Sequence, residues 1–180
     1  MIVAQRLKQQ NIAEYLLYMW QVEDILRAHQ LDIDRLDASY LSQFKVEGAQ
    51  RQELRQWYEN LAEMMRSEGV VEKGHLQINK NIIILLNDLH GQLLKSTKHP
   101  YYSAAYYKAL PYIVELRQRS QSQDECELEN CFDAMYGLLL LRLQGKPVSE
   151  ETQKAFQTIT QFLALLSEYY KKDKAGEVEF

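Results

Sequence analysis

Apolar residues recur at intervals of three and four along most of this 180-residue chain, which is the period of an amphipathic α-helix. The pattern predicts about six helices, at residues 11–29, 48–67, 79–95, 100–119, 126–144 and 150–173, with a lesser segment at 32–44. No stretch alternates with a period of two, so no sheet is expected. We therefore predict an all-α fold: a single-domain bundle of about six helices over residues 1–173, followed by a frayed polar tail at 174–180.

Three predicted helices begin at recognisable capping sequences. "NIAE" (11–14) and "SQDE" (122–125) have the spacing of a capping box, in which the first side chain binds the backbone of the helix and the fourth reaches back. Ser149 precedes a helix whose first turn is acidic, as the helix dipole favours. Pro111 falls inside the helix at 100–119 and is expected to kink it, because proline removes one backbone hydrogen bond.

The charge of the chain argues against nucleic acid as a partner. The formal net charge is −4, and the lysines and arginines are spread along the sequence. Nucleic-acid surfaces need clustered bases, because release of counterions supplies most of the non-specific affinity. The densest basic run, at 171, 172 and 174, closes the last helix, where the dipole alone accounts for it.

Cysteine usage and the apolar runs favour a cytoplasmic protein. Cys126 and Cys131 are five residues apart in a predicted helix, so they point in different directions and do not suit a disulfide or a CxxC pair. The first fifteen residues lack the pattern of a secretory signal. The longest apolar run, "GLLLL", is too short to span a bilayer, so no membrane association is expected.

Motifs for metals and catalysis are missing from the sequence. The only Glu-x-x-His match is Glu72 with His75, and it straddles a glycine at a predicted helix break. The four histidines lie in four different segments, there is no Gly-x-Ser-x-Gly, and the glycines are scattered. We therefore predict no metal and no cofactor, and consider an enzyme less favoured than a binding protein.

Three polar residues lie on apolar helix faces: Arg142, His90 and Glu23. Arg142 falls in the middle of a face formed by Leu128, Phe132, Leu138 and neighbouring side chains. It either bends out to water at the nearby helix end, which we favour, or binds an anionic group. His90 lies at the flank of another apolar face, where a hydrogen-bonded core histidine is the commoner outcome than a ligand or base.

The adjacent acids Glu23 and Asp24 point in different directions on the first long helix. Asp24 projects toward the polar side and is expected to be a solvated charge. Glu23 lies on the apolar face, four residues before Arg27, which is the favoured order for an ion pair along a helix. We favour a rim salt bridge between Glu23 and Arg27, and keep as the alternative a pair between Glu23 and Arg142 across a helix interface.

Tyrosine is abundant, with twelve residues that include the pairs at 101–102, 106–107 and 169–170. In each pair one ring is expected to face the core and the other to point elsewhere. Tyrosine suits the edges of packed helices and binding surfaces equally well. Leu17 and Trp20 lie off the main apolar face of their helix, so they form a candidate interaction surface.

The stretches "NIAEYLLYMWQVEDILRA" and "HPYYSAAYYKALPYIVELR", with "NDLH" between them, resemble a family of uncharacterised all-helical proteins, a domain of unknown function, from Bacteroidetes-type bacteria. The resemblance covers nearly the whole chain. It implies a bacterial, cytoplasmic, single-domain protein and carries no catalytic residue over to this sequence.

Three functions remain open from the sequence. The first is a non-enzymatic helical bundle that binds other protein, with a homo-oligomer or an unidentified protein as partner. The second is a small-molecule pocket between helices, closed by Tyr106 and Tyr136, in which Arg142 holds an anionic group. The third, an enzyme with Glu23 or His90 as base, would need one of these groups to open onto a cleft with a perturbed pKa.

Overall fold

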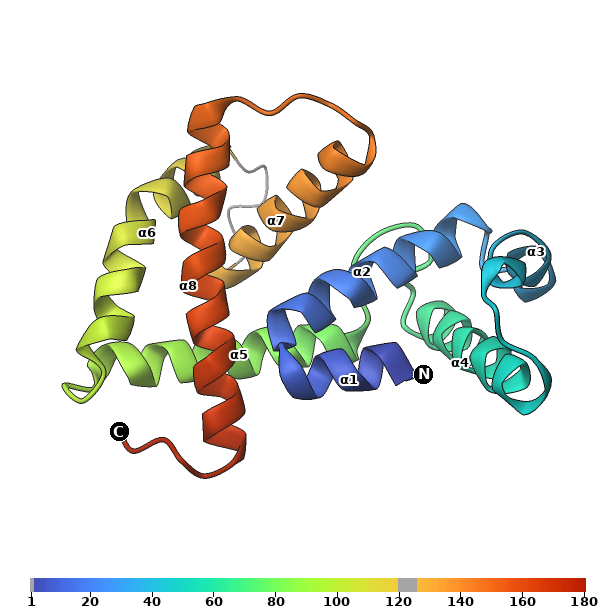
Figure 1. The fold of residues 1–180 in the computed structure, drawn as a ribbon, viewed down its shortest axis with the longest axis horizontal. Coiled ribbons are helices and arrows are strands. Elements are labelled where there is room, and N and C mark those ends of the chain that lie inside the picture. Colours follow the sequence, from blue (N-terminus) through green and yellow to red (C-terminus); the bar gives the residue numbers. More distant parts are fainter. Residues whose placement is uncertain (1, 120–125) are drawn as a thin grey trace. The chain divides into compact units, whose positions relative to one another are not determined.

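The computed structural model describes residues 2–119 and 126–180, and within this part of the chain it contains eight α-helices and one short 3₁₀-helix. Figure 1 shows these helices along the chain. The elements are α1 (Ile2–Gln10), α2 (Ile12–Ala28), α3 (Ile33–Ser39), η1 (Leu41–Gln43), α4 (Gly48–Ser67), α5 (Gln77–Lys95), α6 (Pro100–Arg119), α7 (Glu127–Leu143) and α8 (Glu150–Lys174).

The all-helical fold is confirmed, but the predicted number of about six helices is too low. A separate helix α1 precedes Asn11, and the chain changes direction there (Figure 1). The 32–44 segment divides into α3 and η1. Both extra boundaries fall where hydrophobic periodicity carries little information, because a break of one residue hardly disturbs a three- and four-residue pattern.

The contacts gather into two compact units, one formed by residues 1–6 and 18–81, and the other by residues 7–17 and 82–180. In the first unit α3 packs on α4, and the core includes the fully buried ring of Tyr58. Tyr40 and Trp57 meet this ring edge-on, with ring centres 6.3 and 4.9 Å away. Edge-to-face geometry is the favoured packing of aromatic rings.

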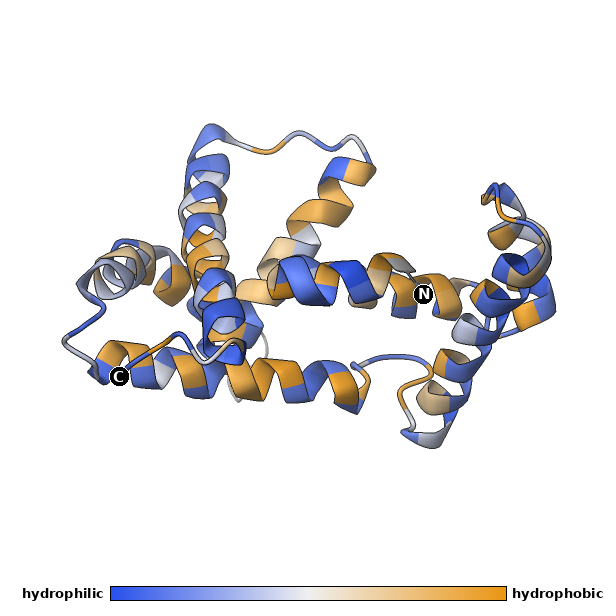
Figure 2. Cartoon of the chain, turned by 60° about the horizontal axis from the view of Figure 1, so that its bottom comes forward, coloured by the Kyte–Doolittle hydropathy of each residue, from blue (hydrophilic) through white to orange (hydrophobic). Residues whose placement is uncertain are grey.

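In the second unit α6 packs mainly against α8 and also against α7, as Figure 1 shows. Aromatic rings from three helices form its centre: His90 of α5, Tyr102 and Tyr106 of α6, and Phe162 of α8. Figure 2 shows that α7 is hydrophobic over most of its C-terminal half.

Two of the three predicted N-terminal caps, at Asn11 and Ser149, are confirmed. The Asn11 side-chain oxygen accepts hydrogen bonds from the backbone N–H groups of Ala13 and Glu14. The Asn11 side-chain amide donates to the Glu14 carboxylate, while the backbone N–H of Asn11 donates to the Leu7 carbonyl. Ser149 accepts from the backbone N–H of Thr152. The second capping box, at 122–125, lies outside the described residues. Helix α6 includes Pro111, which is exposed, and the kink at this residue stays a prediction.

The last residues of the chain lie beside the connection between α5 and α6. Helix α8 includes Lys174, and after it the backbone carbonyl of Glu179 lies 2.9 Å from His99 Nε2. The ring of Phe180 also contacts His99, with ring centres 6.2 Å apart. The single domain predicted for residues 1–173 stays a prediction. Among the described residues, no helix is both long enough and apolar enough to cross a bilayer.

Replacing Ser149 with alanine tests the cap of α8. Loss of the hydroxyl leaves the Thr152 N–H without its side-chain acceptor, so the free energy of unfolding should fall by about 1 kcal/mol. Urea unfolding followed by circular dichroism measures this change. Ser149→Asp is the matched control, because aspartate restores an acceptor and should retain most of the stability. Equal losses in both variants would contradict the cap.

Candidate functional site

The most unusual polar group in the first unit is the carboxylate of Glu23, which is completely buried on α2. Its Oε1 atom accepts hydrogen bonds from the backbone N–H of Leu76, at 3.0 Å, and from Asn79 Nδ2, at 2.7 Å. Its Oε2 atom lies 2.6 Å from His75 Nδ1. All three partners lie just before or within the first turn of α5, where unpaired N–H groups and the helix dipole favour a negative charge.

The imidazole of His75 completes this arrangement by stacking on an indole. Its ring lies 4.0 Å from the ring of Trp20, at an interplanar angle of 14°. Trp20 is 2% exposed. The prediction that Trp20 forms part of an interaction surface is therefore wrong: Trp20 faces His75, three residues from Glu23, and both side chains point from α2 toward the start of α5.

Arg27 does not pair with Glu23, contrary to the favoured prediction. Its guanidinium binds the backbone carbonyls of Val70, at 3.1 Å, and Gly74, and also the carboxylate of Asp24, at 2.9 Å. One turn apart on α2, Glu23 and Arg27 therefore hold the same connection between α4 and α5. Glu23 supplies acceptors at the end of the α4–α5 connection, and Arg27 supplies donors to the middle of that connection.

This geometry assigns Glu23 a structural role. A general base must reach a substrate proton in a cleft, but both oxygens of Glu23 are occupied by protein donors and the residue has no exposed surface. The alternative partner proposed for Glu23, Arg142, is not needed, since the donors come from His75, Leu76 and Asn79. His75 is occupied by Glu23, and among the described residues no three His, Cys, Asp or Glu side chains are grouped to hold a metal ion.

His90 forms the polar centre of the second unit. It is 7% exposed, and its Nδ1 atom lies 2.6 Å from the hydroxyl of Tyr102. Burial lowers the pKa of His90, and the nearby carboxylate of Glu127 opposes this shift. Burial also raises the pKa of Tyr102, so the phenol keeps its proton. This is the hydrogen-bonded core histidine that the sequence favoured.

Two of the residues predicted to form a pocket, Arg142 and Tyr106, have different surroundings in the structure. Arg142 is exposed in the last turn of α7, beside the helix end closed by Gly145, whose N–H binds the Arg142 carbonyl at 3.0 Å. Tyr106 is buried and contacts the His90 ring at 4.8 Å, but its hydroxyl donates to Glu127, at 2.9 Å. The hydroxyl of Tyr106, which was expected to close the pocket, therefore binds a carboxylate of α7.

The remaining candidates do not converge on a site. Leu17 and Tyr136 are both half-buried, on α2 and α7 respectively. Cys131 is buried, and burial raises its pKa to about 12. Cys126 lies at the N-cap of α7 rather than inside a helix, and burial raises its pKa too, which is the opposite of an activated thiol.

An exposed apolar stripe runs along α6, on the side opposite its buried residues. Tyr107 and Val114 are 63% and 44% exposed, and the other three members are exposed as well. These positions follow one another at intervals of four and three, so they lie within one arc of the helix. We call this surface the outer stripe of α6; it comprises Pro100, Ala104, Tyr107, Pro111 and Val114.

Sequence reasoning missed His75 as the partner of Glu23. His75 was considered only as a metal ligand in the Glu72 motif, because its neighbours in sequence are polar and glycine-rich. The usable signal was Glu23 itself: a carboxylate on an apolar helix face requires donors. A histidine directly before a helix N-terminus is a natural source of them.

The chain belongs to the family described as Domain of unknown function (DUF4924), whose model matches residues 1–177. Comparison with curated proteins gives no match, and comparison with solved structures gives none either. The expected resemblance to a domain of unknown function is therefore confirmed.

Replacing Glu23 with glutamine tests the buried carboxylate. The amide presents N–H groups toward donors that need acceptors, so the free energy of unfolding should fall by about 2–4 kcal/mol. The matched control is Asp24→Asn, one residue along, where a half-exposed ion pair is worth less than about 1 kcal/mol. Urea unfolding followed by tryptophan fluorescence measures both. Equal losses in the two variants would contradict the role assigned to Glu23.

The lowered pKa of His90 predicts a pH dependence of stability. Below its ordinary value of 6.5, the unfolded chain binds a proton at this imidazole that the folded chain does not, so stability falls as the pH decreases through 6.5. The wild type should lose more stability than His90→Gln between about pH 7 and about pH 5.5, because only the wild type carries this imidazole. Urea unfolding at both pH values compares them, and parallel losses would rule out the contribution of His90.

Proposed function

We propose that this protein is a non-enzymatic helical domain that acts through protein–protein interaction, and that its partner is a second copy of the same chain bound at the outer stripe of α6. The observation that carries the proposal is the exposure of this stripe. Solvent-exposed apolar residues are ordinary when they are scattered. An exposed row at the spacing of a helix–helix seam indicates a binding surface.

The spacing of the stripe suits another helix as its partner. Alternating steps of four and three residues are the pattern by which one helix inserts side chains between those of another. Tyr107 supplies a large ring with a polar tip, which is the kind of residue enriched in interfaces. Ala104 and Pro111 are small or rigid, so they allow a close approach at little cost in side-chain entropy.

Charges beside the stripe favour self-association over an unrelated helix. Lys108 and Glu115 are exposed on the same flank, seven residues apart. When two copies of a helix meet antiparallel, the same flanks face each other, so Lys108 of each copy lies toward Glu115 of the other. A two-fold interface repeats every contact twice, so this pairing is self-complementary.

The proposal extends to origin and location. The resemblance supports a bacterial protein from a Bacteroidetes-type organism in the cytoplasm, and the acidic balance supports a protein partner in preference to nucleic acid or an anionic membrane surface. The structural use of Glu23, His90 and Tyr106 supports a non-enzymatic role, because the polar groups suited to catalysis bind other parts of the chain.

Sedimentation velocity from about 1 to about 200 µM tests self-association. Because Lys108 of one copy lies toward Glu115 of the other, the seam is centred near Pro111. It lies at the small end of protein interfaces, so we expect a dimer with a dissociation constant of about 1–100 µM. Tyr107→Glu should weaken the dimer at least about tenfold, since it buries a charge in the seam. A strictly monomeric wild type would contradict the proposal.

Leu143→Glu is the matched control, because Leu143 is 64% exposed on α7 of the same unit. It should leave the dimer intact. Charge reversal tests whether the two α6 helices are antiparallel. Lys108→Glu and Glu115→Lys should each weaken the dimer, and the double variant should recover it because opposite charges face each other again. Dissociation by Leu143→Glu with no effect of Tyr107→Glu would assign the interface to a different helix.

A further inference from the structure

A cleft of about 420 Å³ lies in the second unit beside α8. The end of α1 forms one wall, and two turns near the end of α8 form the other. Its lining consists of Lys8, Gln9, Gln10, Ile12, Ser167, Tyr170, Lys171 and Lys174. This volume falls in the range of sites for small molecules, about 300–1,000 Å³.

A buried hydrogen bond links α8 to the first turn of α2, which directly follows the end of α1; its donor also bonds to the Asn11 side chain. The backbone N–H of Ala13, in the first turn of α2, donates to the hydroxyl of Ser167 on α8, at 3.3 Å. That hydroxyl donates in turn to the carbonyl of Leu163, at 2.9 Å. The segment that carries Lys8 is therefore held against α8 by a fixed contact, and the cleft belongs to the folded unit.

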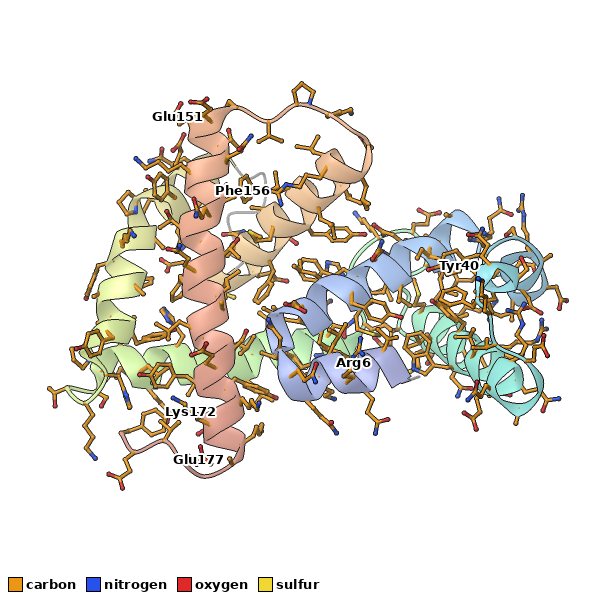
Figure 3. All side chains as sticks on the ribbon, viewed as in Figure 1. Arg6, Tyr40, Glu151, Phe156, Lys172 and Glu177 are labelled. Atoms are coloured by element: carbon orange, nitrogen blue, oxygen red, sulfur yellow. The ribbon has the colours of Figure 1, made fainter. Side chains whose placement is uncertain are left out.

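The lining carries three ammonium groups and no carboxylate. Lys174 Nζ lies 5.4 Å from the ring centre of Tyr170, and Lys8 Nζ lies 5.6 Å from that of Tyr15. Such contacts orient a cation while leaving its N–H donors available. Lys172, which Figure 3 labels on α8, instead lies over Tyr169, 5.7 Å away, and does not line the cleft.

Helix dipoles account for lysines at the end of either helix, because cations are stabilised in the last turn. They do not account for two helices ending beside the same cleft with their lysines lining it. The chain as a whole is negative, so this is a local reversal of charge. Asp173 is a neighbouring acid: burial chiefly, and then Asp173, raise the pKa of Tyr170, so its hydroxyl stays a donor.

We propose that this cleft binds a small phosphorylated ligand that also carries an apolar or aromatic part. A phosphate bears more than one negative charge and several acceptor oxygens, which match Lys8, Lys171 and Lys174 as donors. The Tyr170 ring and Ile12 offer the apolar surface for the remainder. A nucleotide and a phospholipid headgroup share this chemistry.

Isothermal titration calorimetry with ATP, inorganic pyrophosphate and adenosine tests the proposal. ATP and pyrophosphate should bind and adenosine should not, because the phosphates supply the recognition. The triple variant Lys8→Gln, Lys171→Gln, Lys174→Gln should weaken binding at least about tenfold. Co-sedimentation with vesicles of phosphatidylglycerol, against phosphatidylcholine alone, gives the lipid arm: binding to the anionic vesicles only, lost in the same triple variant, would identify a headgroup as the source.

The matched control is Lys95→Gln, Lys146→Gln, Lys154→Gln, which removes the same charge from the same unit outside the cleft. It should keep ATP binding within about twofold of the wild type, and circular dichroism checks that both variants fold. No binding of any phosphate-bearing probe by the wild type would overturn the proposal. Equal losses in the two triple variants would overturn it too, because they would indicate attraction to the general charge of the surface.

Discussion

The buried carboxylate of Glu23 is the constraint on which the first unit depends. A charge without solvent contact is tolerated only when protein donors replace water. Here the donors come from His75, Leu76 and Asn79, so α2 and the start of α5 cannot separate without exposing unpaired groups. Arg27 adds donors to the middle of the same connection, which makes the α4–α5 connection a fixed part of the fold.

The second unit uses its buried polar groups in the same manner. His90 and Tyr102 bind each other, and Tyr106 binds Glu127, which also lies 3.6 Å from Arg117. The residues that looked most capable of chemistry therefore hold helices together. The proposed binding sites therefore lie on the surface. The outer stripe of α6 supplies apolar area, and the cleft beside α8 supplies positive charge.

The sequence predicts the helices well because the spacing of apolar residues within each segment is enough to identify a helix face. It also identifies Glu23 and His90 as misplaced polar residues. It does not predict their partners, since His75 is 52 positions from Glu23 and nothing local links them. Arg142 is exposed in the last turn of α7, in line with the favoured alternative. The helical wheel could not decide between the two alternatives, because only the packing of α7 determines which of its apolar turns are covered. Lys8 and Lys171 are likewise far apart in sequence and line the same cleft only in the folded unit.

Hydrogen exchange at the Leu76 amide tests the central claim most directly. This N–H lies just before α5, in a connection where backbone amides ordinarily exchange fast. If Glu23 accepts its proton within a closed, buried contact, the amide should exchange as slowly as those in the middle of α4, such as Leu61, because exchange then requires the unit to open. Exchange as fast as at Lys73, in the same connection, would contradict the account.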